Sequence, residues 1–243
     1  MITQILDRRP ATSIADVIDM MTAIDVTLPD ADGLKWFNRL YLRVTEAVAV
    51  AVGTGVVFQD PPFLERLDIV FANLYFEAAA AGDVTPSAAP SAWAPLFAAR
   101  HERGISRLQF ALAGMNAHIN RDLPDALVKT HVQLGGMPLP RGPRHADFDT
   151  VNGLLERVEA QVKTEFLTGA IAVIDAAAGA LDDIAAMWSV RKARELAWTN
   201  AQVLWQLRPL PLLGAEFFAR LDSFTGCTGR GFLVRVSRPA GVT

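Results

Sequence analysis

The sequence predicts an all-α, single-domain bundle of about seven to nine helices around a buried central helix, with an extended C-terminal tail. Apolar side chains recur at three- and four-residue steps along most of the 243 residues. The chain has 13 Phe but only 2 Tyr and is rich in alanine, a balance that favours helices over a β-sandwich. No composition shift and no internal repeat divides the chain, so residues 1–243 are expected to form one domain.

The N-terminal part contains three predicted helices. Ser13 is placed to cap the first, and Asp16 follows at the position that would complete a capping box. The second helix covers Leu34–Val52, between an Asp-Gly turn and two glycines. Asp60 and two prolines open the third, whose apolar side carries an aspartate and a tyrosine. These boundaries give each helix one face for the core.

The middle of the chain begins with a long Pro/Ser/Ala loop over residues 82–95, which Trp93 is expected to anchor. A short helix then leads into the segment Ile105–Leu123, and Pro124 marks either a new helical turn or a kink. A further helix ends at a Gly-Gly pair, and residues 137–149 read as a loop.

The C-terminal part contains a helical run over residues 149–183 and another over 184–207. A short last helix over residues 212–226 is expected to end in a flexible turn at the glycine-rich stretch TGCTGRG. The alternating FLVRV that follows has no strand partner, and we expect it to lie extended on the helices.

The segment Ile105–Leu123 organises the expected fold because it has no broad solvated face, which indicates an interior helix. Its polar side chains gather in two groups. One side of the helical wheel carries Ala111, Gly114, Met115, His118 and Asp122, and the opposite side carries Gln109, Asn116 and Asn120. Because a buried polar group without a partner costs about 1–3 kcal/mol, each group is either a structural network or a site.

Composition restricts the partners and the compartment. The formal net charge of −3 provides no basic field for phosphates, so nucleic acid is not expected as a partner. The single Cys227 excludes an internal disulfide and, with no signal peptide apparent, indicates a reducing cytoplasmic compartment. The longest apolar run is interrupted by Asp175 and is too short for a membrane span.

His118 and Asp122 are the strongest candidates for chemistry. They lie one helical turn apart on the same side, a spacing that lets a carboxylate orient an imidazole for proton transfer. Ala111 and Gly114 are expected to leave open space beside the ring. The alternative is an interior histidine whose hydrogen bonds are satisfied by a neighbouring carboxylate.

A second set of polar residues is expected to bind a small, partly apolar substrate around this pair. Asp68 and Tyr75 share one side of the third helix, where an acid among aromatic neighbours needs a partner or a shifted pKa. The predicted substrate-binding residues are Asn116, Asn120, Arg121, Asp68, Tyr75, Arg39 and His101.

No cofactor is required by this interpretation, although a metal-dependent hydrolase remains an alternative. Such a site would add His101, Asp68 or Glu77 to His118 and Asp122 as ligands. HExxH, GxSxG, P-loop and dinucleotide-binding motifs are all absent from the sequence. The residues alone therefore do not select a metal.

Four blocks of the sequence resemble a family of bacterial and fungal proteins known only as a domain of unknown function. The blocks are DGLKWFNRLYLRVTEAV, FLERLDIVFANLYFEA, WAPLFAAR and LQFALAGMNAHINRDLPDALV. The resemblance covers most of the chain, and GMNAHINRDLP is its most specific part. It implies a mainly helical single domain and brings no activity, cofactor or catalytic residue.

The leading hypothesis is an intracellular small-molecule enzyme in which His118 donates or accepts a proton and Asp122 orients it. Hydrolysis, cyclisation and isomerisation would all use these groups. The alternatives are a non-catalytic helical binding or interaction protein, in which the same groups only fix helix packing, and the metal-dependent hydrolase.

Overall fold

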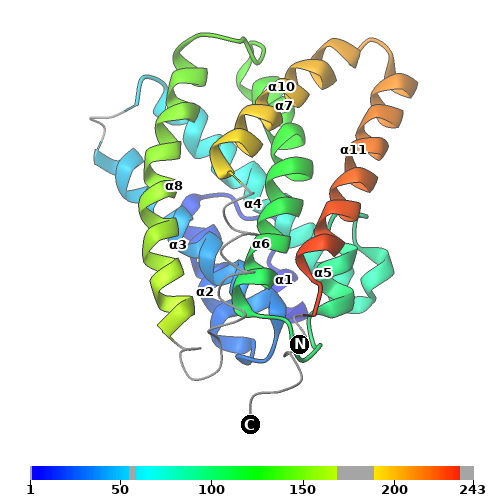
Figure 1. Cartoon of the computed structure of the whole chain (residues 1–243). Helices are drawn as coiled ribbons and strands as arrows, with labels where there is room; N and C mark the ends of the chain where they lie inside the picture. Colours follow the sequence, from blue (N-terminus) through cyan, green and yellow to red (C-terminus); the bar gives the residue numbers. More distant parts are fainter. Residues whose placement is uncertain (1, 55–57, 169–188, 236–243) are drawn as a thin grey trace.

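The chain folds as an all-α bundle, as predicted (Figure 1). A computed structural model describes residues 2–54, 58–168 and 189–235, with the backbone alone described for 159–168. The described residues contain no strand, and none of their helices combines the length and apolar character that a membrane span requires. The helices are α1 (Thr3–Leu6), α2 (Ile14–Thr27), α3 (Gly33–Thr54), α4 (Pro61–Val84), η1 (Pro86–Ala88), α5 (Ala94–Ala99), α6 (Arg107–Ala117), the π-helical η2 (His118–Asp122), α7 (Leu123–Leu134), α8 (Pro143–Thr168), α10 (Val190–Leu207) and α11 (Pro211–Phe232).

The predicted helix starts are confirmed by their caps. The Ser13 hydroxyl accepts a hydrogen bond from the backbone N–H of Asp16 at 3.1 Å, and the Asp16 carboxylate accepts one from the N–H of Ser13 at 3.0 Å. This reciprocal pair satisfies donors that the first turn leaves free. The Asp60 carboxylate likewise accepts from the N–H of Phe63 at the start of α4. Local side chains therefore determine where α2 and α4 begin.

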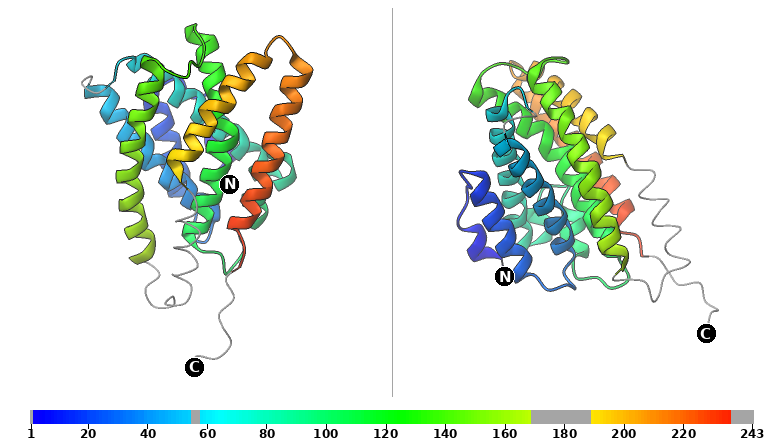
Figure 2. Two further views of the ribbon diagram at one scale, coloured as in Figure 1. Left: turned by 45° about the horizontal axis from the view of Figure 1, so that its top comes forward. Right: turned by 90° about the vertical axis from the view of Figure 1, so that its left-hand side faces the viewer.

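The run α6–η2–α7 lies at the centre of the bundle (Figure 1). Helix α3 packs on one side of α6 and α11 on the other, while α10 packs against α7. Figure 2 shows α2 at one edge of the molecule and α10 and α11 at the opposite edge. Residues 109–119 are all buried, which confirms the interior helix that the sequence predicted.

The C-terminal helix is longer than predicted, and the expected turn at TGCTGRG is wrong. Helix α11 continues through this stretch to Phe232. A Cβ at Gly226 would overlap the backbone of Ser91, and one at Gly229 would lie 3.5 Å from the Asn116 side chain. The glycines therefore let α11 approach its neighbours closely, a role that spacing alone does not distinguish from a turn.

Other boundaries also differ from the prediction. Helix α8 begins at Pro143, so the predicted loop over residues 137–149 is half as long as expected. Of the predicted tail, residues 233–235 are described and non-helical, and the Gln109 amide donates to the carbonyls of Phe232 and Val234 at 2.9 and 2.8 Å. The end of the predicted run over 149–183 and the start of 184–207 lie outside the described residues.

Helices α3 and α6 are in close contact at Gly114. A Cβ at this position would overlap the ring of Phe37, which is itself fully buried. The open space expected beside Gly114 is therefore absent, because Phe37 fills it. A glycine here allows the aromatic ring to lie directly against the α6 backbone.

We expect Gly114→Ala to lower the free energy of unfolding by about 1–3 kcal/mol, since overpacking forces side chains or backbone to shift. Gly231→Ala is the control, because nothing lies within 4 Å of a Cβ there and alanine is the better helix former. Urea denaturation of the two variants checks this. Equal stabilities would show that the α3–α6 contact adapts without strain.

Candidate functional site

The central helix widens into a π-helical turn at the GMNAHINRDLP block. The N–H of Leu123 donates to the carbonyl of His118, five residues earlier instead of four. Pro124 follows directly; it has no N–H to donate, and in a regular α-helix its ring would clash with the carbonyl of Asn120. A wider turn relieves that clash, and such π-bulges are frequent at functional sites. Sequence reasoning left a new helical turn and a kink open at Pro124; the structure has a local widening at His118–Asp122, directly followed by α7.

Asp122 is a fully buried carboxylate with three donors around it. Its Oδ2 accepts from Nδ1 of His118 at 3.0 Å and from the indole N–H of Trp93 at 2.9 Å. Its Oδ1 accepts from the guanidinium of Arg121 at 2.6 Å. Arg121 also approaches Asp222 of α11, with 3.4 Å between Nε and Oδ1. The Asp122 carboxylate is therefore paired with the Arg121 cation and also accepts hydrogen bonds from His118 and Trp93.

This pairing assigns the tautomer of His118. An ionised carboxylate only accepts hydrogen bonds, so Nδ1 of His118 carries the proton and Nε2 presents a lone pair. Burial lowers the pKa of His118, against the opposing effect of the hydrogen bond to Asp122. The imidazole is consequently neutral near pH 7, and Nε2 is available as a proton acceptor.

The imidazole ring is enclosed by aromatic side chains and is 1% exposed. It stacks on Phe71 with 3.5 Å between ring centroids and 5° between planes. Tyr41 and Phe37 meet it edge-on, at 4.5 and 5.6 Å between centroids. Phe71 is itself partly exposed, so one aromatic ring separates the buried histidine from the surface. The ring does not face the open space that the sequence suggested.

Four buried polar atoms near His118 have no hydrogen-bond partner of good geometry among the described residues. They are Nε2 of His118, the Tyr41 hydroxyl, the Thr45 hydroxyl and Oδ2 of Asp68. The two hydroxyls lie near each other, since Thr45 acts on Tyr41 to lower its pKa against the larger effect of burial. Tyr41 and Thr45 are one turn apart on α3, and Asp68 is one turn before Phe71 on α4. Because buried polar groups are nearly always satisfied, this concentration indicates a place for a water or for a polar group of a ligand.

Burial also shifts the acids in this cluster toward their protonated forms. It raises the pKa of Asp68 from 3.8 to about 7. It raises the pKa of Tyr41 well above 10, with further increases from the negative charges of Asp68 and Asp122. Near neutral pH the cluster therefore contains one neutral proton acceptor, His118, one carboxyl that is about half protonated, Asp68, and one hydroxyl that keeps its proton, Tyr41.

Tyr41, Thr45 and Trp93 join the site although no binding or catalytic role was predicted for them. Trp93 was expected only to anchor its loop, and its bond to Asp122 does so from inside the core. The sequence did contain a hint that Tyr41 belongs to a polar site. It is one of only two tyrosines, and it lies one turn from both Phe37 and Thr45 on the predicted helix Leu34–Val52. Sequence periodicity did not show that this face meets His118.

The remaining predicted binding residues do not meet at His118. Tyr75 lies at the edge of the cluster, but its hydroxyl donates to Asn38 at 3.1 Å. Asn116 donates to the carbonyl of Thr225 at 2.9 Å, and Asn120 donates to Asn116. Asn116 therefore joins the central helix to α11, and Asn120 supports Asn116.

Arg39 and His101 lie away from the cluster. Arg39 forms two hydrogen bonds with Asp25, at 3.1 and 3.0 Å. The His101 side chain is 73% exposed and lies 3.8 Å from Asp32. Helical spacing could not reveal this, because it specifies a face and not the element that the face meets.

The ligands considered for a metal are not brought together. Within residues 2–54, 58–158 and 189–235, no group of three or more His, Cys, Asp or Glu side chains is placed to hold an ion. Glu77 is exposed, as is His101, while Asp68 and His118 are buried. The metal-dependent alternative therefore gains no ligand set from the described side chains.

The raised pKa of Asp68 predicts a specific pH dependence of stability. Below pH 3.8 the carboxyl is neutral in both states; between pH 4 and 7 the unfolded chain releases its proton while the folded chain retains it. The free energy of unfolding of the wild type should thus fall by up to about 4 kcal/mol as pH rises to 7, because of this carboxyl. The free energy of unfolding of Asp68→Asn should not show this fall.

Urea denaturation of wild type and Asp68→Asn at pH 4–8 measures the difference. The free energies of unfolding of the two proteins are subtracted at each pH. The subtraction is needed because the buried histidines, whose pKa values are lowered, make the free energy of unfolding rise with pH in both proteins. Asp19→Asn, at an exposed position of α2, is the control and should show no such trend. A difference between wild type and Asp68→Asn that is constant with pH would contradict the prediction.

Phe71 is expected to maintain the low pKa of His118. Phe71→Ala admits water to the ring and should raise the pKa of His118, since burial is the largest cause of its depression. NMR titration of the histidine resonances measures this. His131, which packs against Phe63 and Trp198, is the internal reference and should not change. A shift of both histidines would indicate general loosening.

Comparisons with known proteins agree with the resemblance seen in the sequence. The model of a family described as a family of unknown function (DUF5995) matches residues 14–235. No curated protein and no solved structure matches the chain. The matched region includes the complete run α6–η2–α7 and every residue of the His118 cluster. The chain therefore belongs to this family of unknown function.

Proposed function

We propose that the protein acts on a small, partly apolar molecule at the His118 cluster, with His118 accepting a proton and Asp122 orienting the ring. The observation that carries the proposal is the buried Nε2 of His118, which has no partner among the described residues although Nδ1 is bonded to the carboxylate of Asp122. His131 also has an unpartnered Nε2, but its Nδ1 is bonded to a backbone carbonyl, whereas His118 has a carboxylate on Nδ1 and the Tyr41 ring beside it.

The cluster has the parts that general acid–base chemistry requires. His118 is neutral and Asp68 has a pKa of about 7, so an acceptor and a donor coexist near the pH of the cell. Tyr41 adds a second hydroxyl donor for polar substrate atoms. Hydrolysis, cyclisation and isomerisation share this proton transfer, and it is the step that we assign to these residues.

Access to His118 is proposed to involve Phe71. This side chain is the partly exposed partner of the stacked pair, and side-chain rotation is fast on the timescale of catalysis. A substrate with an apolar body would replace the stacking that the imidazole loses. The surrounding aromatic rings supply the apolar lining that small-molecule sites have.

A non-catalytic helical binding protein is the second candidate. The observation in its favour is the close enclosure of the imidazole by Phe37, Tyr41 and Phe71. In that case the four unpartnered atoms would bind ordered water and fix the packing of α3, α4 and η2. The two candidates make different predictions: the first requires a compound that the wild type consumes and that His118 variants consume more slowly, and the second predicts no turnover.

The proposed location is the cytoplasm, and the proposed partner is a small molecule and not a nucleic acid. Cys227, the single cysteine, is an exposed free thiol, which suits a reducing compartment. A net charge of −3 offers no attraction for phosphates.

The test is to incubate the purified protein with a small-molecule extract of cells and to follow changes by mass spectrometry. We expect compounds that wild type consumes to be consumed at least about 100-fold more slowly by His118→Gln, since general acid–base groups contribute typically 10²–10⁴-fold. His101→Gln, at an exposed histidine, should behave as wild type. Equal turnover by His118→Gln would reject the catalytic role.

Stability measurements accompany this assay. If His118→Ala is destabilised and no compound is consumed by wild type, the packing role is supported. Asp122→Asn should reduce turnover with His118 unchanged, because an amide can donate to Nδ1 and favour the wrong tautomer.

A further inference from the structure

The outer side of α11 carries a row of side chains with the spacing of a helix–helix seam. Its members follow one another at alternating steps of three and four residues along α11 and the residue before it: Leu210, Leu213, Phe217, Arg220, Phe224 and Cys227. Side chains at this spacing share one face and are the positions through which two helices pack in a coiled coil. We call this row the α11 seam.

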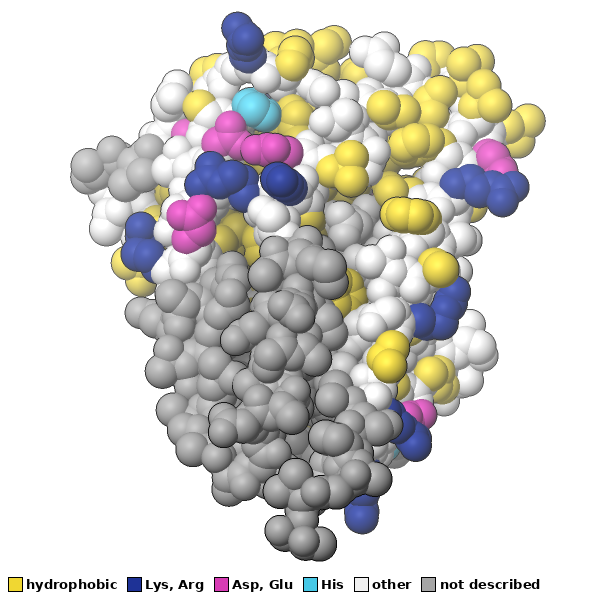
Figure 3. All heavy atoms as spheres, viewed as in Figure 1, with side chains coloured by type: hydrophobic (Ala, Val, Ile, Leu, Met, Phe, Trp, Pro, Cys, Tyr) yellow, Lys and Arg dark blue, Asp and Glu magenta, His cyan; other side chains and the backbone are white. Residues whose placement is uncertain are grey.

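The α11 seam is exposed in a single chain. Phe224 is 72% exposed, Leu213 is 58% exposed and Leu210 is 51% exposed, while Phe217 is partly buried. Figure 3 shows hydrophobic side chains gathered over the end of α10 and the beginning of α11. Exposed apolar side chains that lie together mark an interaction surface. The spacing and the exposure together indicate that another helix packs there.

The opposite side of α11 attaches the helix to the bundle. The Asp222 carboxylate accepts hydrogen bonds from the N–H groups of Ser91 and Ala92 at 2.9 and 3.0 Å. Nearly one turn later, the carbonyl of Thr225 accepts from the Asn116 amide at 2.9 Å. These contacts hold α11 so that the seam faces away from the bundle.

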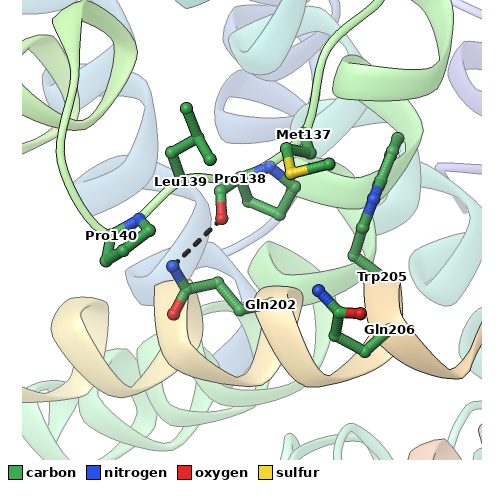
Figure 4. Close-up of a pocket in the computed structure, with 7 residues that line it drawn as sticks. All are labelled: Met137, Pro138, Leu139, Pro140, Gln202, Trp205 and Gln206. Atoms are coloured by element: carbon green, nitrogen blue, oxygen red, sulfur yellow. Dashed lines mark hydrogen bonds between the residues drawn. The ribbon is translucent and has the colours of Figure 1, made fainter.

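Helix α10 supports the start of α11. A Cβ at Gly214 would lie 3.6 Å from the Cβ of Leu207, so the two helices are in direct contact where they join. On another side of α10, the Gln202 amide donates to the carbonyl of Pro138 at 3.0 Å, beside the hollow in Figure 4. The seam is thus presented by a helical hairpin that is already fixed, so little conformational entropy is lost when a partner binds.

The seam is complementary to a second copy of itself. When two copies of α11 lie antiparallel, with a two-fold axis between residues 218 and 219, every seam position meets a seam position of the other copy. The resulting pairs are Leu210 with Cys227, Leu213 with Phe224, and Phe217 with Arg220. Apolar side chains therefore meet apolar side chains at both ends of the contact.

The charges beside the two-fold axis are complementary as well. In the single chain Arg220 binds Glu216, with 2.7 Å between Nε and Oε1, and the two side chains are 81% and 59% exposed. In the antiparallel pair, the Arg220 guanidinium of one copy reaches the Glu216 carboxylate and the Phe217 ring of the other. The one cation of the seam therefore meets an anion and an aromatic face instead of a like charge.

We propose that the α11 seam is a homodimer interface, at which two chains pair antiparallel about a two-fold axis. This symmetry forms each contact twice and uses the seam of both copies, so the assembly closes at two chains. One helix from each chain gives a small interface, which is typical of reversible association. The proposal does not rest on the proposed function, because the seam contains no residue of the His118 cluster.

Sedimentation velocity of the full chain, with a reductant to keep Cys227 reduced, tests the proposal. We expect the weight-average mass to rise from one chain toward two between about 1 and 300 µM, as for a small interface. Phe224→Glu should raise the dissociation constant at least about tenfold, because its carboxylate would lie against Leu213 of the other copy. Val26→Glu is the control and should dimerise as the wild type does, since Val26 is 80% exposed on α2, at the opposite edge of the molecule (Figure 2).

An exchange of charges tests the antiparallel register. Arg220→Glu and Glu216→Arg each place like charges across the two-fold axis, and each should raise the dissociation constant about tenfold, since the repulsive contact occurs twice. An equimolar mixture of the two variants should dimerise about tenfold more tightly than either variant alone, because each glutamate then faces an arginine. General attraction would not explain this result. The wild type has a formal net charge of −3 and each replacement changes it by two, so both variants stay negative.

Three outcomes would overturn the proposal. A monomer at every concentration would leave the seam to a different partner. A dimer that is as tight in Phe224→Glu as in the wild type would place the interface elsewhere. A mixture of the two charge variants with no more dimer than its components alone would exclude the antiparallel pairing.

Discussion

The buried carboxylate of Asp122 is the constraint on which the centre of the molecule depends. An ionised group removed from water is stable only when paired and hydrogen-bonded, and here Trp93, His118 and Arg121 supply the donors. Trp93 connects the loop before α5 to the core, and Arg121 reaches Asp222 on α11. The charge of Asp122, directly through Trp93 and indirectly through Arg121, thus links the central helix to two segments that are distant in sequence.

The same constraint produces the unusual state of His118. Because Asp122 takes the proton-bearing Nδ1, the other nitrogen must be an acceptor, and the surrounding aromatic rings bury it. Burial lowers the pKa of the imidazole while it raises the pKa of the Asp68 carboxyl. One apolar environment therefore favours the neutral form of a base and of an acid together.

Much of the fold and part of the site could be predicted from the sequence. Ser13 and Asp60 marked helix starts, and the absence of a polar face on residues 105–123 indicated an interior helix. The pairing of His118 with Asp122 followed from helical spacing, because both residues lie on one segment. Gly114 was misread as open space, since a glycine leaves room that only the neighbouring helix shows to be filled.

The sequence by itself determined the helical class, the buried central segment and the i, i+4 contact of imidazole and carboxylate. These features depend on interactions within one helix, which periodicity and capping residues specify. Only the tertiary structure decided that Tyr41 lies against His118 with Thr45 and Asp68 close to Tyr41, that Asn116 instead joins α11, and that His101 lies at the surface. Those outcomes depend on which faces of different helices meet, and that is set by the packing of the whole core.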